Sequence, residues 1–107
     1  MIETMSFPNL GPAEFKAAFE ADENAVVLDV RTPDEIAEGK IERAIELNFF
    51  DDNFQQEVLK LDANKSYYIY CRSGRRSANA CAFLAQNGYA KVTNLDGGMM
   101  AWEVAKV

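Results

Sequence analysis

The chain has 107 residues, 49% of them hydrophobic and 26% charged, and its formal net charge is −6. These values indicate one globular domain and exclude a disordered or fibrous protein. The acidic balance argues against nucleic-acid or anionic-membrane partners, because both need an extended basic surface. Histidine is absent, which excludes Cys-His and Ser-His nucleophile pairs and His-ligated metals within this chain.

The sequence contains no pattern typical of export or membrane insertion. The first twenty residues lack the charged start and the apolar run of a signal peptide, and no apolar segment is long enough to span a bilayer. The two cysteines, Cys71 and Cys81, are too few for a structural zinc site and indicate reduced thiols. We therefore expect a cytoplasmic protein without a metal or an organic cofactor.

In chain order, the first predicted element is a helix that begins at Gly11-Pro12. The β-branched apolar run at residues 25–30 predicts a strand that is covered on both faces. Thr32 and Glu35 then have the spacing of a capping box, which predicts a short helix, and Gly39 should end it.

Further along the chain, three more strands alternate with three more helices. The helix between the second and third strands should be capped by Asp51 or Asp52, and the last helix should run through Trp102. This alternation predicts an α/β fold with a central, mainly parallel sheet and helices on both faces. The three strands are expected at residues 44–48, 66–71 and 91–95, and the helices at residues 51–61, at residues 75–86 and after Gly98.

The segment after the third strand concentrates positive charge beside a cysteine. Arg72, Arg75 and Arg76 lie within five residues of Cys71 in the sequence. Ligands collect beyond the carboxyl ends of parallel strands, and a glycine-containing turn before a helix forms an anion-binding cradle. The helix N-terminus and the arginines favour the thiolate, so Cys71 should have a lowered pKa and act as a nucleophile. The alternative is a cysteine that only packs at the end of a strand.

Other residues are interpreted from their settings. Cys81 lies on the alanine-rich face of the following helix and should be an inert core residue. Asp29 and Arg31 stand at the carboxyl end of a strand, which favours a supporting role over a simple surface ion pair. Trp102 should close the core rather than line a substrate pocket.

The chain resembles a single-domain rhodanese, of the rhodanese-like sulfurtransferase family, from about Asn9 to its end. It departs from the family pattern at residues 39–44, which read Gly-Lys-Ile-Glu-Arg-Ala instead of Gly-His-Ile-Pro-Gly-Ala, and at Ile36, where an aromatic is common. The resemblance implies one three-layer rhodanese-like domain over residues 1–107. It rests on Asp29-Val30-Arg31 with Glu35, on Cys71-Arg72-Ser73-Gly74-Arg75-Arg76-Ser77, and on Gly97-Gly98 with Trp102.

The same resemblance implies the activity of a thiosulfate sulfurtransferase. In rhodaneses, the matching cysteine takes a sulfane sulfur from an anionic donor such as thiosulfate and becomes a persulfide. It then passes the sulfur to cyanide, a thiol or a protein acceptor. Cys71 would be this carrier, with Asp29 and Arg31 supporting the cradle. The residues implied in the cradle and in donor binding are Arg72, Ser73, Gly74, Arg75, Arg76 and Ser77.

Two alternatives of the same fold stay open. A phosphatase or arsenate reductase typically has five residues between its cysteine and its arginine. Here only four separate Cys71 from Arg76, and Ser77 stands where the longer loop has its arginine, which favours sulfur transfer. The second alternative is a non-catalytic interaction or sulfur-carrier module, although the presence of Cys71 argues against a purely structural one.

Overall fold

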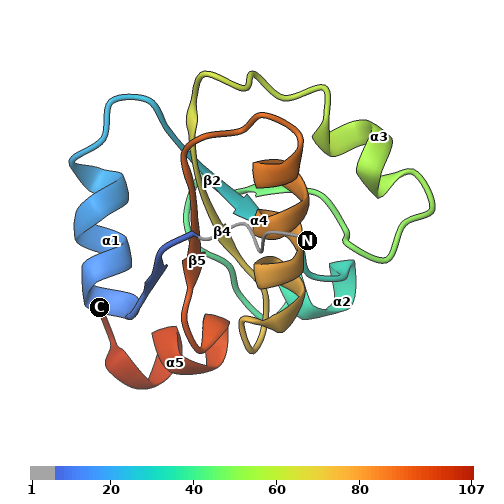
Figure 1. Ribbon diagram of the computed structural model, residues 1–107. Helices are drawn as coiled ribbons and strands as arrows, with labels where there is room; N and C mark the ends of the chain where they lie inside the picture. Colours follow the sequence, from blue (N-terminus) through green and yellow to red (C-terminus); the bar gives the residue numbers. More distant parts are fainter. Residues whose placement is uncertain (1–6) are drawn as a thin grey trace, which may run out of the picture.

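The computed structural model, which describes residues 7–107, contains a sheet in which all neighbouring strands are parallel (Figure 1). The strands are β1 (Asn9–Leu10), β2 (Ala25–Asp29), β3 (Ile45–Glu46), β4 (Ser66–Tyr70) and β5 (Val92–Leu95). They lie in the order β1-β5-β4-β2-β3, so β4 is central. The predicted α/β class is therefore confirmed.

Helices lie on both faces of the sheet, which confirms the predicted layers (Figure 1). They are α1 (Pro12–Glu20), α2 (Pro33–Ile36), α3 (Phe54–Val58), α4 (Arg75–Gln86) and α5 (Gly98–Ala105). One core cluster joins α3 and α4 to the sheet, and the other joins α1 and α5 to the opposite face. Within residues 7–107, none of the helices has the length and apolar character needed to cross a membrane.

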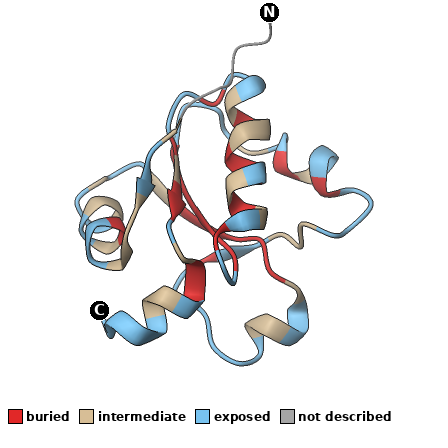
Figure 2. Ribbon diagram, turned by 60° about the horizontal axis from the view of Figure 1, so that its bottom comes forward, coloured by how far each residue is buried: buried red, intermediate tan, exposed pale blue. Residues whose placement is uncertain are grey.

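The central strand β4 shows how the two cores are built. Successive side chains of a strand point to opposite faces, so Tyr67 and Ile69 join the α3/α4 cluster while Tyr68 and Tyr70 join the α1/α5 cluster. All residues of β4 are buried, in the red centre of Figure 2. A continuous apolar run is what a parallel strand with two covered faces requires. Cys71 follows directly at the buried carboxyl end of this strand.

The structure differs from the expected elements at β1, at α3 and at the end of α2. β1 was not predicted, because two residues carry no periodic pattern, and it forms only by pairing with β5. Neither Asp51 nor Asp52 caps α3: its N-cap is Asn53, which makes no side-chain capping bond, because the chain first turns with the Phe54 N–H donating to the Asp51 carbonyl. The helix also ends at Val58 instead of continuing to residue 61.

The capping box at the start of α2 is confirmed. The Thr32 hydroxyl accepts a hydrogen bond from the Glu35 N–H at 3.4 Å, and the Glu35 carboxylate accepts one from the Thr32 N–H at 3.0 Å. The helix ends at Ile36, three residues before Gly39. This cap fixes the Glu35 carboxylate at the N-terminal end of α2, where the strands also end.

Candidate active site

The Cys71 sulfur lies at the centre of a short turn between β4 and α4. Its residue is fully buried, with 0% exposure. The sulfur accepts hydrogen bonds from the Gly74 N–H at 3.1 Å, the Ser77 hydroxyl at 3.3 Å and the Ser77 N–H at 3.4 Å. Three donors therefore converge on one sulfur, an arrangement that suits a negative charge there, and anion binding by the turn stays a prediction.

These donors set the protonation of Cys71. Burial raises the pKa of its thiol, but the side chain and the N–H of Ser77, with the N–H groups of Gly74 and Ser73, together lower it further, so that the net shift is downward. The predicted direction is therefore correct. Its causes are hydrogen bonds at the start of α4, as expected of a helix N-terminus, rather than the charges of the neighbouring arginines. The arrangement favours a nucleophilic thiolate.

The turn is held in place by its neighbours. Gly74 has a φ of 98°, in the left-handed region, which allows the sharp turn into α4. Its carbonyl accepts a hydrogen bond at 3.1 Å from the side chain of Asn94, which is buried in β5. Asn94 also donates to Asn9 of β1 at 2.9 Å. The edge strand that the sequence did not predict thus helps to position the cysteine turn.

The three arginines of the turn have different settings. Arg72 and Arg75 are exposed, as is Ser73 between them. Arg76 is largely covered, and its two terminal nitrogens donate to the two oxygens of Glu35, each at 2.8 Å. The structure thus brings Cys71, Gly74 and Ser77 together, and it places Arg76 on a carboxylate of α2. The role of all three arginines in substrate binding stays a prediction.

Asp29 and Arg31 form a buried ion pair rather than a surface one. Asp29 is 0% and Arg31 4% exposed, and the shortest of their hydrogen bonds is 2.7 Å. Arg31 also donates to the carbonyls of Glu35 at 3.2 Å and Gly39 at 2.7 Å. Burial would lower the pKa of Arg31, but Asp29 raises it, and the net shift is upward, so Arg31 stays charged. It fixes the segment that carries Glu35.

The segment that departs from the family pattern is also tied to the sheet. The Ile41 N–H donates to the Tyr70 hydroxyl at 3.0 Å, and the Lys40 ammonium binds Glu46 at 2.8 Å. Arg43 has a φ of 70° in the position where glycine is common in the family. The loop therefore follows a defined path without its usual proline and glycine.

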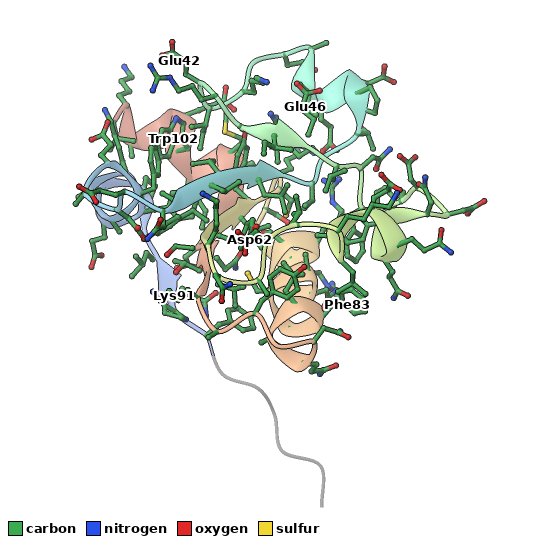
Figure 3. All side chains as sticks on the ribbon, turned by 90° about the horizontal axis from the view of Figure 1, so that it is seen from above. Glu42, Glu46, Asp62, Phe83, Lys91 and Trp102 are labelled. Atoms are coloured by element: carbon green, nitrogen blue, oxygen red, sulfur yellow. The ribbon has the colours of Figure 1, made fainter. Side chains whose placement is uncertain are left out.

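Cys81 and Trp102 have the structural settings that the sequence predicted. Cys81 is 0% exposed in the α3/α4 cluster, and burial raises the pKa of its thiol to about 12. Trp102 belongs to the cluster on the other face, with its ring centroid 6.4 Å from that of Phe15 and 6.5 Å from that of Phe19. Figure 3 shows Trp102 and Phe83 on opposite sides of the sheet.

Sequence reasoning missed three contributions to this site. Glu35 was known only as part of a motif, and nothing in the chain could pair it with Arg76, which lies 41 positions away. Asn94 was read only as a strand residue. Gly98 was a motif residue without a role, yet a Cβ there would lie 2.4 Å from the Arg72 carbonyl oxygen. A polar residue within an apolar strand was the only available signal for Asn94.

Comparison with known proteins gives the family. A family model described as "Rhodanese-like domain" matches residues 11–105. A protein of Allochromatium vinosum named sulfurtransferase is 44% identical over 80 residues, covering 75% of this chain and 73% of the relative. YtwF of Bacillus subtilis, which carries a provisional sulfurtransferase name, is 40% identical over 99 residues, covering 92% and 93% of the two chains.

A solved structure supports the same assignment. The crystal structure of a rhodanese-related protein from Thermoplasma volcanium aligns with a TM-score of 0.79 at 28% identity, covering 92% of this chain and 93% of that one. The fold, the cysteine turn and these matches all point to the same family. The chain belongs to the rhodanese-like family.

Proposed function

We propose that this protein is a sulfurtransferase that carries a sulfane sulfur on Cys71, as a persulfide, from an anionic donor such as thiosulfate to a thiophilic acceptor. One observation carries the proposal: the buried Cys71 sulfur accepts three hydrogen bonds from Gly74 and Ser77, and these bonds lower its pKa. Membership of the rhodanese-like family, with relatives named sulfurtransferase, supports this chemistry.

The proposed reaction is a double displacement at sulfur. The Cys71 thiolate attacks the outer, sulfane sulfur of thiosulfate, the S–S bond of the donor breaks, and sulfite leaves with the electron pair. The new persulfide keeps one negative charge on its outer sulfur. Cyanide or a thiolate then attacks that outer sulfur, the Cys71 persulfide bond breaks, and the thiolate returns. Neither step needs a proton transfer when the reactants are ionised.

The chain can perform these steps without a histidine base. A general base is needed to activate a neutral thiol, whereas the donors around Cys71 favour the thiolate directly. The same N–H groups of Gly74 and Ser77 would face the charge that develops on sulfur in each displacement. The missing histidine is therefore consistent with sulfur transfer.

Local charge would bring the donor to the turn. The chain as a whole is acidic, with a net charge of −6, and would repel an anion. Arg72 and Arg75 are exposed at the turn and supply the opposite field there. Because both side chains face solvent, we expect their attraction for thiosulfate to weaken as ionic strength rises.

Intact-mass spectrometry tests the proposed carrier. The protein is treated with thiosulfate, freed of excess reagent and weighed. We expect the wild type to gain the mass of one sulfur atom and to lose it again, as thiocyanate, when cyanide is added. Cys71→Ser should gain nothing.

Cys81→Ala is the matched control, because it removes the other thiol and leaves the turn intact. It should still gain one sulfur atom, with a modest loss of stability from the smaller buried side chain. A folded wild type that gains no sulfur from thiosulfate and instead hydrolyses an aryl phosphate would overturn the proposal in favour of the phosphatase alternative.

A further inference from the structure

Arg76 differs from the other arginines of the turn because its guanidinium is paired with a carboxylate of the protein. It makes a bidentate pair with Glu35, with both N···O distances at 2.8 Å. The side chains of Arg76 and Glu35 are only 18% and 23% exposed. The ring of Phe50 lies over the guanidinium, at 5.2 Å from its carbon. An anion that used Arg76 would have to compete with an adjacent, well-shielded carboxylate.

Glu35 is itself held in the conformation that binds Arg76. Its Oε1 atom accepts hydrogen bonds from the Thr32 N–H at 3.0 Å and the Thr32 hydroxyl at 3.1 Å, besides the one from Arg76. The hydrogen bonds from Arg76, and then those from Thr32, outweigh burial and lower the pKa of Glu35 to about 2. The carboxylate therefore stays charged and in place at neutral pH.

Among the described residues, 7–107, Arg72 and Arg75 have no comparable partner. Both are exposed, and no carboxylate of residues 7–107 lies within ion-pair distance of either. Their charges are uncompensated at the turn, whereas the charge of Arg76 is cancelled by Glu35. The three arginines that look equivalent in the sequence thus divide into two free cations and one neutralised pair.

We propose that Glu35 determines which arginines of the cysteine turn bind an anion: by pairing with Arg76 it removes that arginine from anion binding, and it leaves Arg72 and Arg75 to receive the donor. Arg76 then positions the turn, because it joins the first turn of α4 to the capped end of α2. This inference deepens the proposed function and rests on it only for the identity of the donor.

The test uses sulfate, which carries no transferable sulfur. Cys71 is alkylated with iodoacetamide, a neutral reagent, and sulfate is added at constant ionic strength, because screening alone would change the rate. The measured quantity is the sulfate concentration that halves the alkylation rate of each variant relative to its own rate without sulfate. Intact mass identifies the modified cysteine.

Glu35→Gln is the informative substitution. Glutamine still accepts the capping hydrogen bond from Thr32, so α2 should keep its start, but the charge that neutralises Arg76 is lost. We expect sulfate to protect Cys71 at a concentration about tenfold lower than in the wild type, as one freed guanidinium would provide. Arg76→Gln alone leaves the Glu35 charge unpaired beside the turn, so the double variant Glu35→Gln/Arg76→Gln, which keeps the net charge, is compared with the wild type. It should lose the gain of Glu35→Gln and need a protecting concentration within twofold of that of the wild type.

Glu57→Gln is the matched control, because it breaks the exposed Glu57–Lys60 pair of α3 by the same substitution away from the turn. It should leave protection as in the wild type. Thermal unfolding of each variant confirms that it is folded. A tenfold loss of protection in Glu35→Gln/Arg76→Gln would show that Arg76 binds the anion in the wild type and would overturn the inference. The inference would also be overturned if Glu35→Gln did not lower the sulfate concentration that protects Cys71.

The outcome is separable from that of the proposed function. Alkylation and sulfate protection report anion binding at the turn, whereas sulfur gain from thiosulfate reports transfer. If the protein gains sulfur but Glu35→Gln has no effect on sulfate protection, only the inference about Glu35 and Arg76 is refuted. A protein that shows the Glu35→Gln effect but gains no sulfur refutes only the sulfurtransferase proposal.

Discussion

Cys71 and Cys81 carry the same thiol, but their contacts shift its pKa in opposite directions. Both Cys71 and Cys81 are buried. Burial raises the pKa of either thiol, but only Cys71 has Gly74 and Ser77 as hydrogen-bond donors to its sulfur, and these lower its pKa below the ordinary value. Cys81 has apolar neighbours, and its pKa rises to about 12. A thiolate is therefore favoured at one position and disfavoured at the other.

Alkylation as a function of pH should reveal this difference. Thiolate is lost as the pH falls below the pKa, so the Cys71 rate should have its midpoint at a lower pH than that of an ordinary exposed cysteine. The Cys81 rate should stay near zero up to the pH at which the fold itself opens. Single-cysteine variants Cys81→Ala and Cys71→Ser allow each rate to be followed by intact mass. Equal rates at neutral pH would contradict the assignment of Cys71 as the nucleophile.

At the scale of elements, the start of α5 holds the cysteine turn from the side opposite to α2. The Met99 N–H donates to the Cys71 carbonyl at 2.9 Å, and the Met100 N–H donates to the Arg72 carbonyl at 3.0 Å. This approach requires glycine at position 98, which has a φ of 58°. A Cβ at Gly98 would lie 2.4 Å from the Arg72 carbonyl oxygen.

Gly98→Ala should therefore destabilise the fold by more than the strain of the left-handed backbone conformation alone would. We expect a loss of about 2–4 kcal/mol from the left-handed φ together with the clash against backbone. Gly88→Ala is the control, since Gly88 has a φ of 90° but no atom within 4 Å of the added Cβ, and it should cost only about 1 kcal/mol. Urea denaturation measures both losses. Equal losses would show that the turn can move away from α5.

Across the whole molecule, a polar network joins the sheet to the elements around the site. Asp29 at the end of β2 binds Arg31, Arg31 binds the carbonyls of Glu35 and Gly39, and the Glu35 side chain binds Arg76 of α4. The first pair is almost completely buried, so neither charge could be left alone without a large desolvation cost. Residues that are far apart in the sequence thus share one network.

Removing Asp29 should consequently affect global stability. Asp29→Ala leaves the Arg31 charge buried without its partner, and we expect a loss of about 3–5 kcal/mol in the free energy of unfolding. Glu57→Ala, which breaks the exposed pair with Lys60, should change it by less than about 0.5 kcal/mol. Chemical denaturation followed by fluorescence of Trp102 compares the two. A small effect of Asp29→Ala would mean that solvent reaches Arg31.

The sequence by itself determined the class of fold and the position of the cysteine turn. An apolar run with β-branched residues predicted the strand that became β2, because burial on both faces leaves a continuous local pattern. The tyrosine-rich segment at residues 66–71 predicted β4. The Thr32 and Glu35 capping box was also readable, since its partners are three residues apart. Cys71 followed by Gly74 and a helix start indicated the anion cradle for the same reason: all its parts lie within one short segment.

Only the tertiary structure decided which partners the charged and polar residues of the site have. Glu35 and Arg76 are 41 positions apart, and Asn94 is 20 positions from Gly74. β1 exists only because it pairs with β5. These contacts arise when the parallel strands bring their carboxyl ends to one edge of the sheet, and no local pattern in the chain encodes which side chains meet there. The arginines of the turn look alike in the sequence, and contacts with distant residues give them different settings.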